Sequence, residues 1–210
     1  MFGFFSGILG LATVATSIVS SLSSTLKAVG VALVGVGHII ENLGRNLGVI
    51  NKDEDAVTLG RQAQAAEDLD IKLDDFESFD EYVAKVREQQ VDKNLDDLEN
   101  KDDFARKGMD LIMGLAVEKF GQPTMEKVGE ILGKAPEDAN LILSSKSVAD
   151  FISEDKNNLE NIVGYLNGDN TSETVRNVIL DGISSSKPEL NEDECIGMVK
   201  DLREQINGDQ

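Results

Sequence analysis

The feature that most constrains the fold is an apolar stripe in the first fifty residues. Apolar side chains recur there in steps of three or four residues, a spacing that places them on one face of a helix. The stripe consists of Ile8, Leu11, Ala15, Ile18, Leu22, Leu26, Val29, Leu33, Val36, Ile40, Leu43, Leu47 and Ile50. The sequence therefore predicts one long amphipathic helix, or a helical hairpin of two helices over 2–19 and 28–48 that meet at the Ser-rich run 20–25.

The charge of the chain changes abruptly after this segment. Residues 1–50 contain Lys27 and Arg45 against Glu41, whereas the whole chain has 20 cations, 39 carboxylates and a net charge of −19. Residues 51–210 therefore carry a net charge of −20. We place the boundary at Asn51–Asp55, where an aspartate can cap the next helix. A chain this acidic is not expected to bind nucleic acid, because phosphate binding depends on cations.

The remainder of the chain also has the pattern of helices. Residues 51–210 show no sustained period-two alternation, and the three prolines lie between helical patterns. Ser78 and Glu81 form the S-x-x-E pattern of a capping box, which predicts a helix start. Helix breaks are expected at 121–124, 133–136, 167–170 and 184–188. The predicted fold is all-α, with an apolar segment (1–50), an acidic helical connector (51–102) and a compact acidic helical domain (103–210).

The first residues combine aromatic rings with glycines. Phe2, Phe4 and Phe5 alternate with glycines, and residues 1–12 resemble viral fusion peptides in composition. The first cation is Lys27, so the basic region that precedes the core of a signal peptide is missing and no cleavable signal peptide is expected. Residues 1–26 contain no ionisable side chain, which exceeds the roughly 20 residues that a bilayer requires. Nine Ser or Thr residues within 6–25 weaken the case for a permanently inserted helix.

These patterns favour a non-enzymatic membrane-associating protein whose N-terminal segment inserts or oligomerises at a bilayer. Virion-entry proteins, phage or secretion-system effectors and toxins share this organisation, so the chain is expected at a membrane or in a delivered particle. The predicted membrane or oligomer interface consists of Phe2, Phe4, Phe5, Ile8, Leu11, Ile18, Leu22, Leu26, Val29, Leu33, Val36 and Ile40. If the acidic domain shields this stripe before delivery, low pH should favour insertion, because protonation removes charge that anionic lipid repels.

The alternative is a soluble self-assembling structural or adaptor protein that uses the stripe over 8–50 as an oligomer interface. The expected partners are therefore a lipid bilayer, further copies of the chain, and a basic protein that docks on the acidic domain. These two functions differ in whether lipid is required.

The sequence predicts no catalytic, cofactor-binding or metal-ligating residues. Cys195 lies on a helical stripe with Val199 and Leu202, which predicts a small buried apolar side chain. His38 lies on the small-residue side of the N-terminal segment, where it is expected to be structural or solvated, with pH sensing as the alternative. The clustered carboxylates lack the spacing of a calcium loop.

Overall fold

The computed structural model describes residues 5–91 and 100–208, and the side chains from residue 7 onward. Within these residues the chain is all-helical and contains no strand. The elements in chain order are α1 (Phe5–Ala28), α2 (Leu33–Asn46), α3 (Ala56–Asp68), a 3-10 turn η1 (Leu73–Asp75), α4 (Phe79–Arg87), α5 (Lys101–Phe120), α6 (Gln122–Lys134), α7 (Pro136–Leu143), α8 (Lys146–Glu154), α9 (Asn157–Leu166), α10 (Glu173–Ser186) and α11 (Glu192–Asn207).

The N-terminal segment forms two helices, but the break between them lies later than the Ser-rich run. Hydroxyl groups in this run do not interrupt α1, because Thr25 donates a hydrogen bond to the Ser21 carbonyl (3.0 Å) within the helix. The helix ends instead at Ala28 and is followed by Gly30, whose positive φ of 88° suits a residue without a Cβ. Val31 N–H bonds to the Leu26 carbonyl (2.9 Å) and Gly30 N–H bonds to the Lys27 carbonyl (3.0 Å). This pair of bonds is a Schellman motif, which closes the C-terminus of α1.

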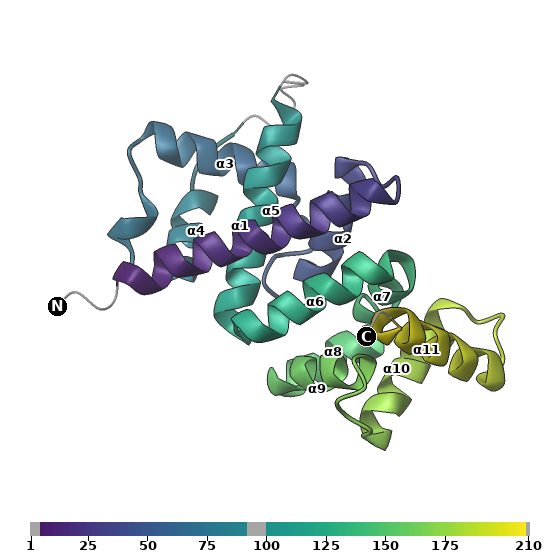
Figure 1. Ribbon diagram of the computed structural model, residues 1–210. Helices are drawn as coiled ribbons and strands as arrows, with labels where there is room; N and C mark the ends of the chain where they lie inside the picture. The colour runs from purple at the N-terminus through teal and green to yellow at the C-terminus, as the bar shows by residue number, and fades with distance from the viewer. Residues whose placement is uncertain (1–4, 92–99, 209–210) are drawn as a thin grey trace.

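Helix α5 forms the centre of the N-terminal half. Its residues 111–117 are all buried, as expected for a helix with neighbours on every side. Helices α1, α2, α3 and α4 all contact it, and α1 also lies along α6 (Figure 1). One continuous core includes residues from Ile8 to Ile206, so the segments predicted on either side of residues 50 and 102 share their buried side chains.

The backbones of α3 and α5 touch at two glycines. A Cβ built on Gly60 would lie 1.7 Å from the Phe104 carbonyl oxygen, and a Cβ on Gly108 would lie 1.8 Å from the Ala56 carbonyl oxygen. Neither position has room for a methyl group. Glycine at both sites is therefore what allows these two helices to cross so closely.

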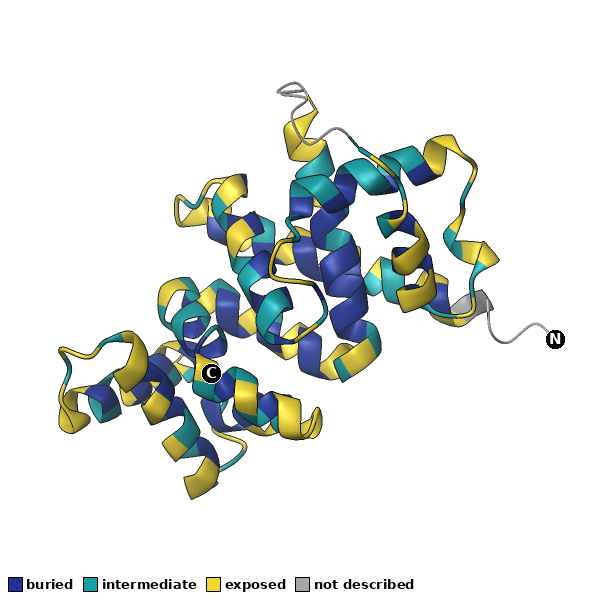
Figure 2. Ribbon diagram, turned by 180° about the vertical axis from the view of Figure 1, so that it is seen from behind, coloured by how far each residue is buried: buried dark blue, intermediate teal, exposed yellow. Residues whose placement is uncertain are grey.

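Several predicted helix ends are confirmed. Asp55 caps α3 by accepting a hydrogen bond from Thr58 N–H (2.8 Å), and Ser78 caps α4 by accepting one from Glu81 N–H (3.1 Å). Helices α5, α6, α9 and α10 end at or within a residue or two of the predicted breaks. Figure 2 shows the result, with buried residues on the inner faces of the helices and exposed residues on the outer faces and turns. Residues 92–99 of the predicted acidic helical connector (51–102) lie outside the described residues.

Candidate functional site

Most of the predicted interface lies inside the chain's own core. Ile8, Ile18, Leu22, Leu26, Leu33, Val36 and Ile40 are buried and Leu11 is half-buried. Helix α1 turns this stripe toward α5 and α6 instead of toward lipid or a second copy. Contact of these side chains with a bilayer would require α1 and α2 to leave their neighbours. Phe2 and Phe4 lie outside the described residues, and Phe5 begins α1 with a side chain that is not described.

The outer face of α1 is made of small residues. Gly7, Gly10, Ser17, Ser20 and Ser24 are exposed along it, and Leu9 (48% exposed) is the large apolar residue among them. A Cβ added to either glycine would meet no atom within 4 Å. Among the described residues, the helical segment 7–28 is long and apolar enough to cross a membrane by length and composition, with a mean hydropathy of 1.5. Core helices of soluble proteins also reach this value. In an apolar medium, a small-residue face of this kind would allow close packing of helix on helix.

The turn between α1 and α2 and the start of α2 expose apolar side chains. Charged residues of other elements lie nearby: Val29 lines a cleft with Glu137 and Asp138, and Val34 lines another with Lys101 and Asp102. Val29 is 64% exposed and Val34 is 57% exposed, and Ala28 and Ala32 are exposed beside them. We call these four residues the apolar turn patch. The sequence contains no ionisable residue between Lys27 and His38. Of the predicted interface residues whose side chains are described, Val29 is the exposed one, and it lies in this patch.

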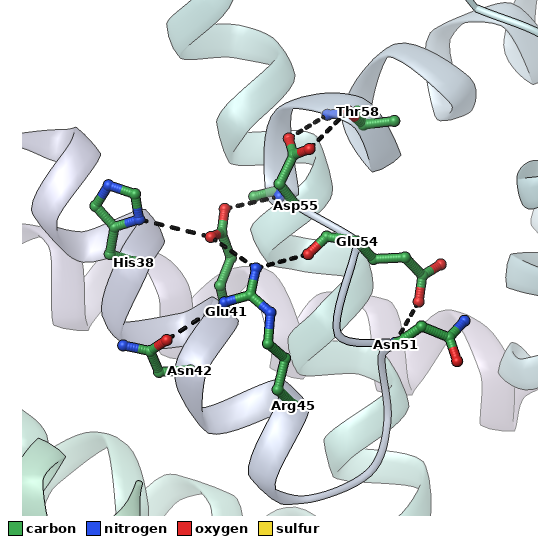
Figure 3. A network of polar contacts seen from close by, with 9 residues as sticks. His38, Glu41, Asn42, Arg45, Asn51, Glu54, Asp55 and Thr58 are labelled. Carbon is green, nitrogen blue, oxygen red and sulfur yellow. Dashed lines mark hydrogen bonds and ion pairs between the residues drawn. The ribbon is translucent and has the colours of Figure 1, made fainter. Parts of the chain in front are cut away.

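A polar cluster ties α2 to the start of α3 (Figure 3). Glu41 is buried, and its carboxylate accepts a hydrogen bond from the Ala56 N–H (2.9 Å). Arg45 lies 3.3 Å from the same carboxylate and donates to the Glu54 carbonyl (2.7 Å). His38 Nδ1 lies 3.6 Å from Glu41 at an exposed position, as expected for a solvated histidine. A buried carboxylate with partners of this kind is held in place, so the cluster acts as a clamp on α2.

The clamp extends to α4 through a second arginine. Arg87 donates two hydrogen bonds to the Glu54 carboxylate (2.6 and 3.1 Å) and one to the Val49 carbonyl (3.2 Å). The forked guanidinium of Arg87 therefore holds the segment between α2 and α3 from the side of α4. The two arginines together hold residues 47–55 between three helices.

A half-buried carboxylate lies where α5 meets α1. Desolvation by burial raises the pKa of Asp110 to about 6, although a hydrogen bond from Thr16 and the nearby Arg106 act in the opposite direction. Asp110 lines a cleft of about 180 Å³ together with Tyr82 and Lys107. Burial also raises the pKa of the Tyr82 phenol, with a further contribution from Glu67. Asp110 is therefore a titratable group that α1 itself covers.

Comparisons with family models, curated proteins and solved structures gave no match for this chain.

The remaining sequence-predicted groups lie apart from one another. Cys195 is buried on α11, which confirms the prediction of a buried apolar side chain. Within the described residues, no three His, Cys, Asp or Glu side chains are grouped so that they could hold a metal ion.

Two features were not predicted from the sequence. The apolar turn patch was represented there by Val29 alone, although the glycine between two valines at 29–31 is a usable signal for a turn. The buried position of Glu41 also had a signal, since Glu41 is the single carboxylate in residues 1–50.

Proposed function

We propose that this chain is a non-enzymatic membrane-associating protein that first contacts a bilayer through the apolar turn patch. The supporting observation is the exposure of Val29 and Val34 at the end of a helix with the length and composition of a membrane span. Transfer of exposed valine side chains from water into the bilayer interface is favourable, because it removes apolar surface from water. Because the patch is already exposed, this first contact requires no change in the fold.

A second step would insert α1. The apolar stripe of α1 contacts α5 and α6 in the closed form, and lipid would replace these contacts after the helix leaves. The small outer face of α1 would then pack against other copies of the helix. The acidic remainder would stay in water and would dock a basic protein partner through its net charge. This division places the protein at a membrane or in a delivered particle.

The second candidate is a soluble structural or adaptor protein that self-assembles. The burial of the stripe favours this candidate, because the core of the chain covers the apolar face of α1 without lipid. Self-association through the stripe would require the same opening as insertion does. In the closed form the apolar turn patch is the surface that offers contact to a second copy.

Liposome flotation tests the first candidate. The variant carries Val29→Asp and Val34→Asp, which place charge on exposed positions and leave the core intact. We expect the unmodified chain to float with liposomes and the variant to bind at least about tenfold more weakly, because aspartate is costly to place in a bilayer. The matched control is Leu69→Asp, since Leu69 is 66% exposed but lies at the end of α3.

The outcomes separate the two functions. Membrane association is contradicted if the unmodified chain stays with the soluble fraction, or if the patch variant floats as well as the control. Sedimentation without lipid tests the second candidate, which expects a defined oligomer that the patch variant dissociates. Circular dichroism of both variants verifies that the helices are retained.

A further inference from the structure

A groove in the C-terminal half combines an apolar floor with cationic side chains. The groove has a volume of about 760 Å³ and lies among α9, α10 and α11. Tyr165, Leu180 and Ile196 contribute apolar surface to it. Arg176, Lys200 and Arg203 provide positive charge, and Glu204 is the one carboxylate among the lining residues. An apolar surface bordered by charge is typical of sites that bind amphipathic segments.

The cations of the groove are available for a ligand. Within the described residues, Arg176 and Arg203 form no ion pair with a carboxylate, and the Lys200 pair with Glu204 is long (3.6 Å) and exposed. The guanidinium of Arg203 lies over the Tyr165 ring at 4.8 Å, which orients it at the groove. The chain has almost two carboxylates for every cation. Arginines without an acidic partner are therefore unexpected here, and two of them share this groove.

The groove is elongated along one helix. Its lining positions on α11 run from Ile196 to Asn207 and follow the i, i+3, i+4 pattern of one helix face. A stretch of twelve helical residues spans about 18 Å at 1.5 Å per residue. This length corresponds to about three turns of a bound helix. A compact small molecule would contact only part of such a face.

We infer that this groove binds an acidic amphipathic helix of a protein partner. Apolar side chains of that helix would cover the floor, and its carboxylates would lie near Arg176, Lys200 and Arg203. Charge complementarity selects the acidic partner, because like charges across the groove would repel. This groove is a different surface from the apolar turn patch, and binding of a helix to it needs no lipid.

The test uses the full chain and synthetic helical peptides of about fourteen residues, long enough for the groove. One peptide has leucines on one face and glutamates flanking them, and its matched partner has glutamine in place of every glutamate. We expect the acidic peptide to bind, with amide shifts in nuclear magnetic resonance spectra confined to α9, α10 and α11. The glutamine peptide should bind at least about tenfold more weakly and with little dependence on salt.

Charge reversal locates the site. Arg176→Glu with Lys200→Glu should weaken binding of the acidic peptide by at least about tenfold, since both side chains border the groove. Lys52→Glu with Lys156→Glu is the control, because it makes the same change in net charge at exposed positions outside the groove. This control should bind as the unmodified chain does.

Three results would overturn the inference. The first is no saturable binding of the acidic peptide at about 1 mM. The second is equal binding by the groove variant and the control. The third is tighter binding of dodecanoate than of the peptide at the same residues, which would assign the groove to a small apolar acid. Because no bilayer is present in these binding measurements, each result is independent of the flotation experiment.

Discussion

At the residue scale, Asp110 couples the α1–α5 contact to pH. Its pKa is raised from 3.8 to about 6, so the folded chain holds this proton more tightly than the unfolded chain does. The stabilisation is fully present below about pH 4 and is lost as the pH rises through about 6, where the carboxyl group ionises in the fold. Acidification therefore strengthens this contact. That direction opposes the expectation, drawn from the sequence, that low pH favours insertion.

Replacing Asp110 by asparagine tests this coupling. Asp110→Asn keeps an oxygen that can accept the Thr16 hydrogen bond and removes the charge. We expect the variant to exceed the unmodified chain in free energy of unfolding by about 1–2 kcal/mol at pH 8, after allowance for partial solvation of the carboxylate. The difference should shrink toward zero at about pH 4. Urea unfolding at both pH values measures it, and a difference that does not vary with pH would contradict the assignment.

At the element scale, the crossing of α3 and α5 depends on the absence of two side chains. Gly60→Ala would place a methyl group against the Phe104 carbonyl, so the helices would have to separate. We expect a loss of about 3 kcal/mol or more in the free energy of unfolding, as for other overpacked or strained core sites. Thermal and urea unfolding provide the measurement.

Gly197→Ala is the matched substitution in open space. A Cβ at Gly197 in α11 meets nothing within 4 Å. This substitution should stabilise the chain by about 0.5–1 kcal/mol, because alanine is the better helix former. Similar effects of the two substitutions would show that the close crossing is absent in solution.

At the scale of the whole molecule, a disulfide between α1 and α6 can test whether α1 must leave the core to enter a bilayer. A Cβ built on Gly133 of α6 lies 3.6 Å from the Thr25 Cβ of α1, within the range of disulfide geometry. Thr25→Cys with Gly133→Cys should therefore form a disulfide that holds α1 on α6, and the free thiol of Cys195 is buried away from it. On the proposed function, the oxidised variant should float with liposomes yet release no trapped dye, and reduction should restore release.

The reduced form of the same variant is the control for this experiment. Equal dye release from the oxidised and reduced forms would show that insertion does not require α1 to separate from α6. The disulfide should also add about 2–4 kcal/mol to the free energy of unfolding, because it closes a long loop.

Local signals in the sequence predicted much of the fold. The caps at Asp55 and Ser78 each involve residues a few positions apart, and each is present in the structure. The same holds for the buried stripe of Cys195, Val199 and Leu202. The partner of the N-terminal stripe could not be predicted in this way. A stripe such as Ile18 and Leu22 indicates that one helix face avoids water, but it does not specify whether lipid, a second copy or α5 covers it.

The break between α1 and α2 shows a second limit of sequence patterns. Serines and threonines favour turns when they compete for backbone hydrogen bonds, but the Thr25 hydroxyl bonds within its own helix. The groove cations were also beyond prediction, because Arg176 and Arg203 lie on different helices and form no local motif.

Because of the Glu41 clamp, α2 is attached to the rest of the chain more firmly than α1 is. Helix α2 is fastened by charged and backbone hydrogen bonds that reach Ala56 and Glu54, whereas α1 rests on α5 and α6 mainly through apolar packing and the Thr16 bond to Asp110. A hydrocarbon solvent can replace the apolar contacts of α1, but it cannot replace the hydrogen bonds and ion pairs that hold α2. On the proposed function, a hydrocarbon solvent would detach the first helix and leave the second as a tether, with Gly30 as the hinge between them.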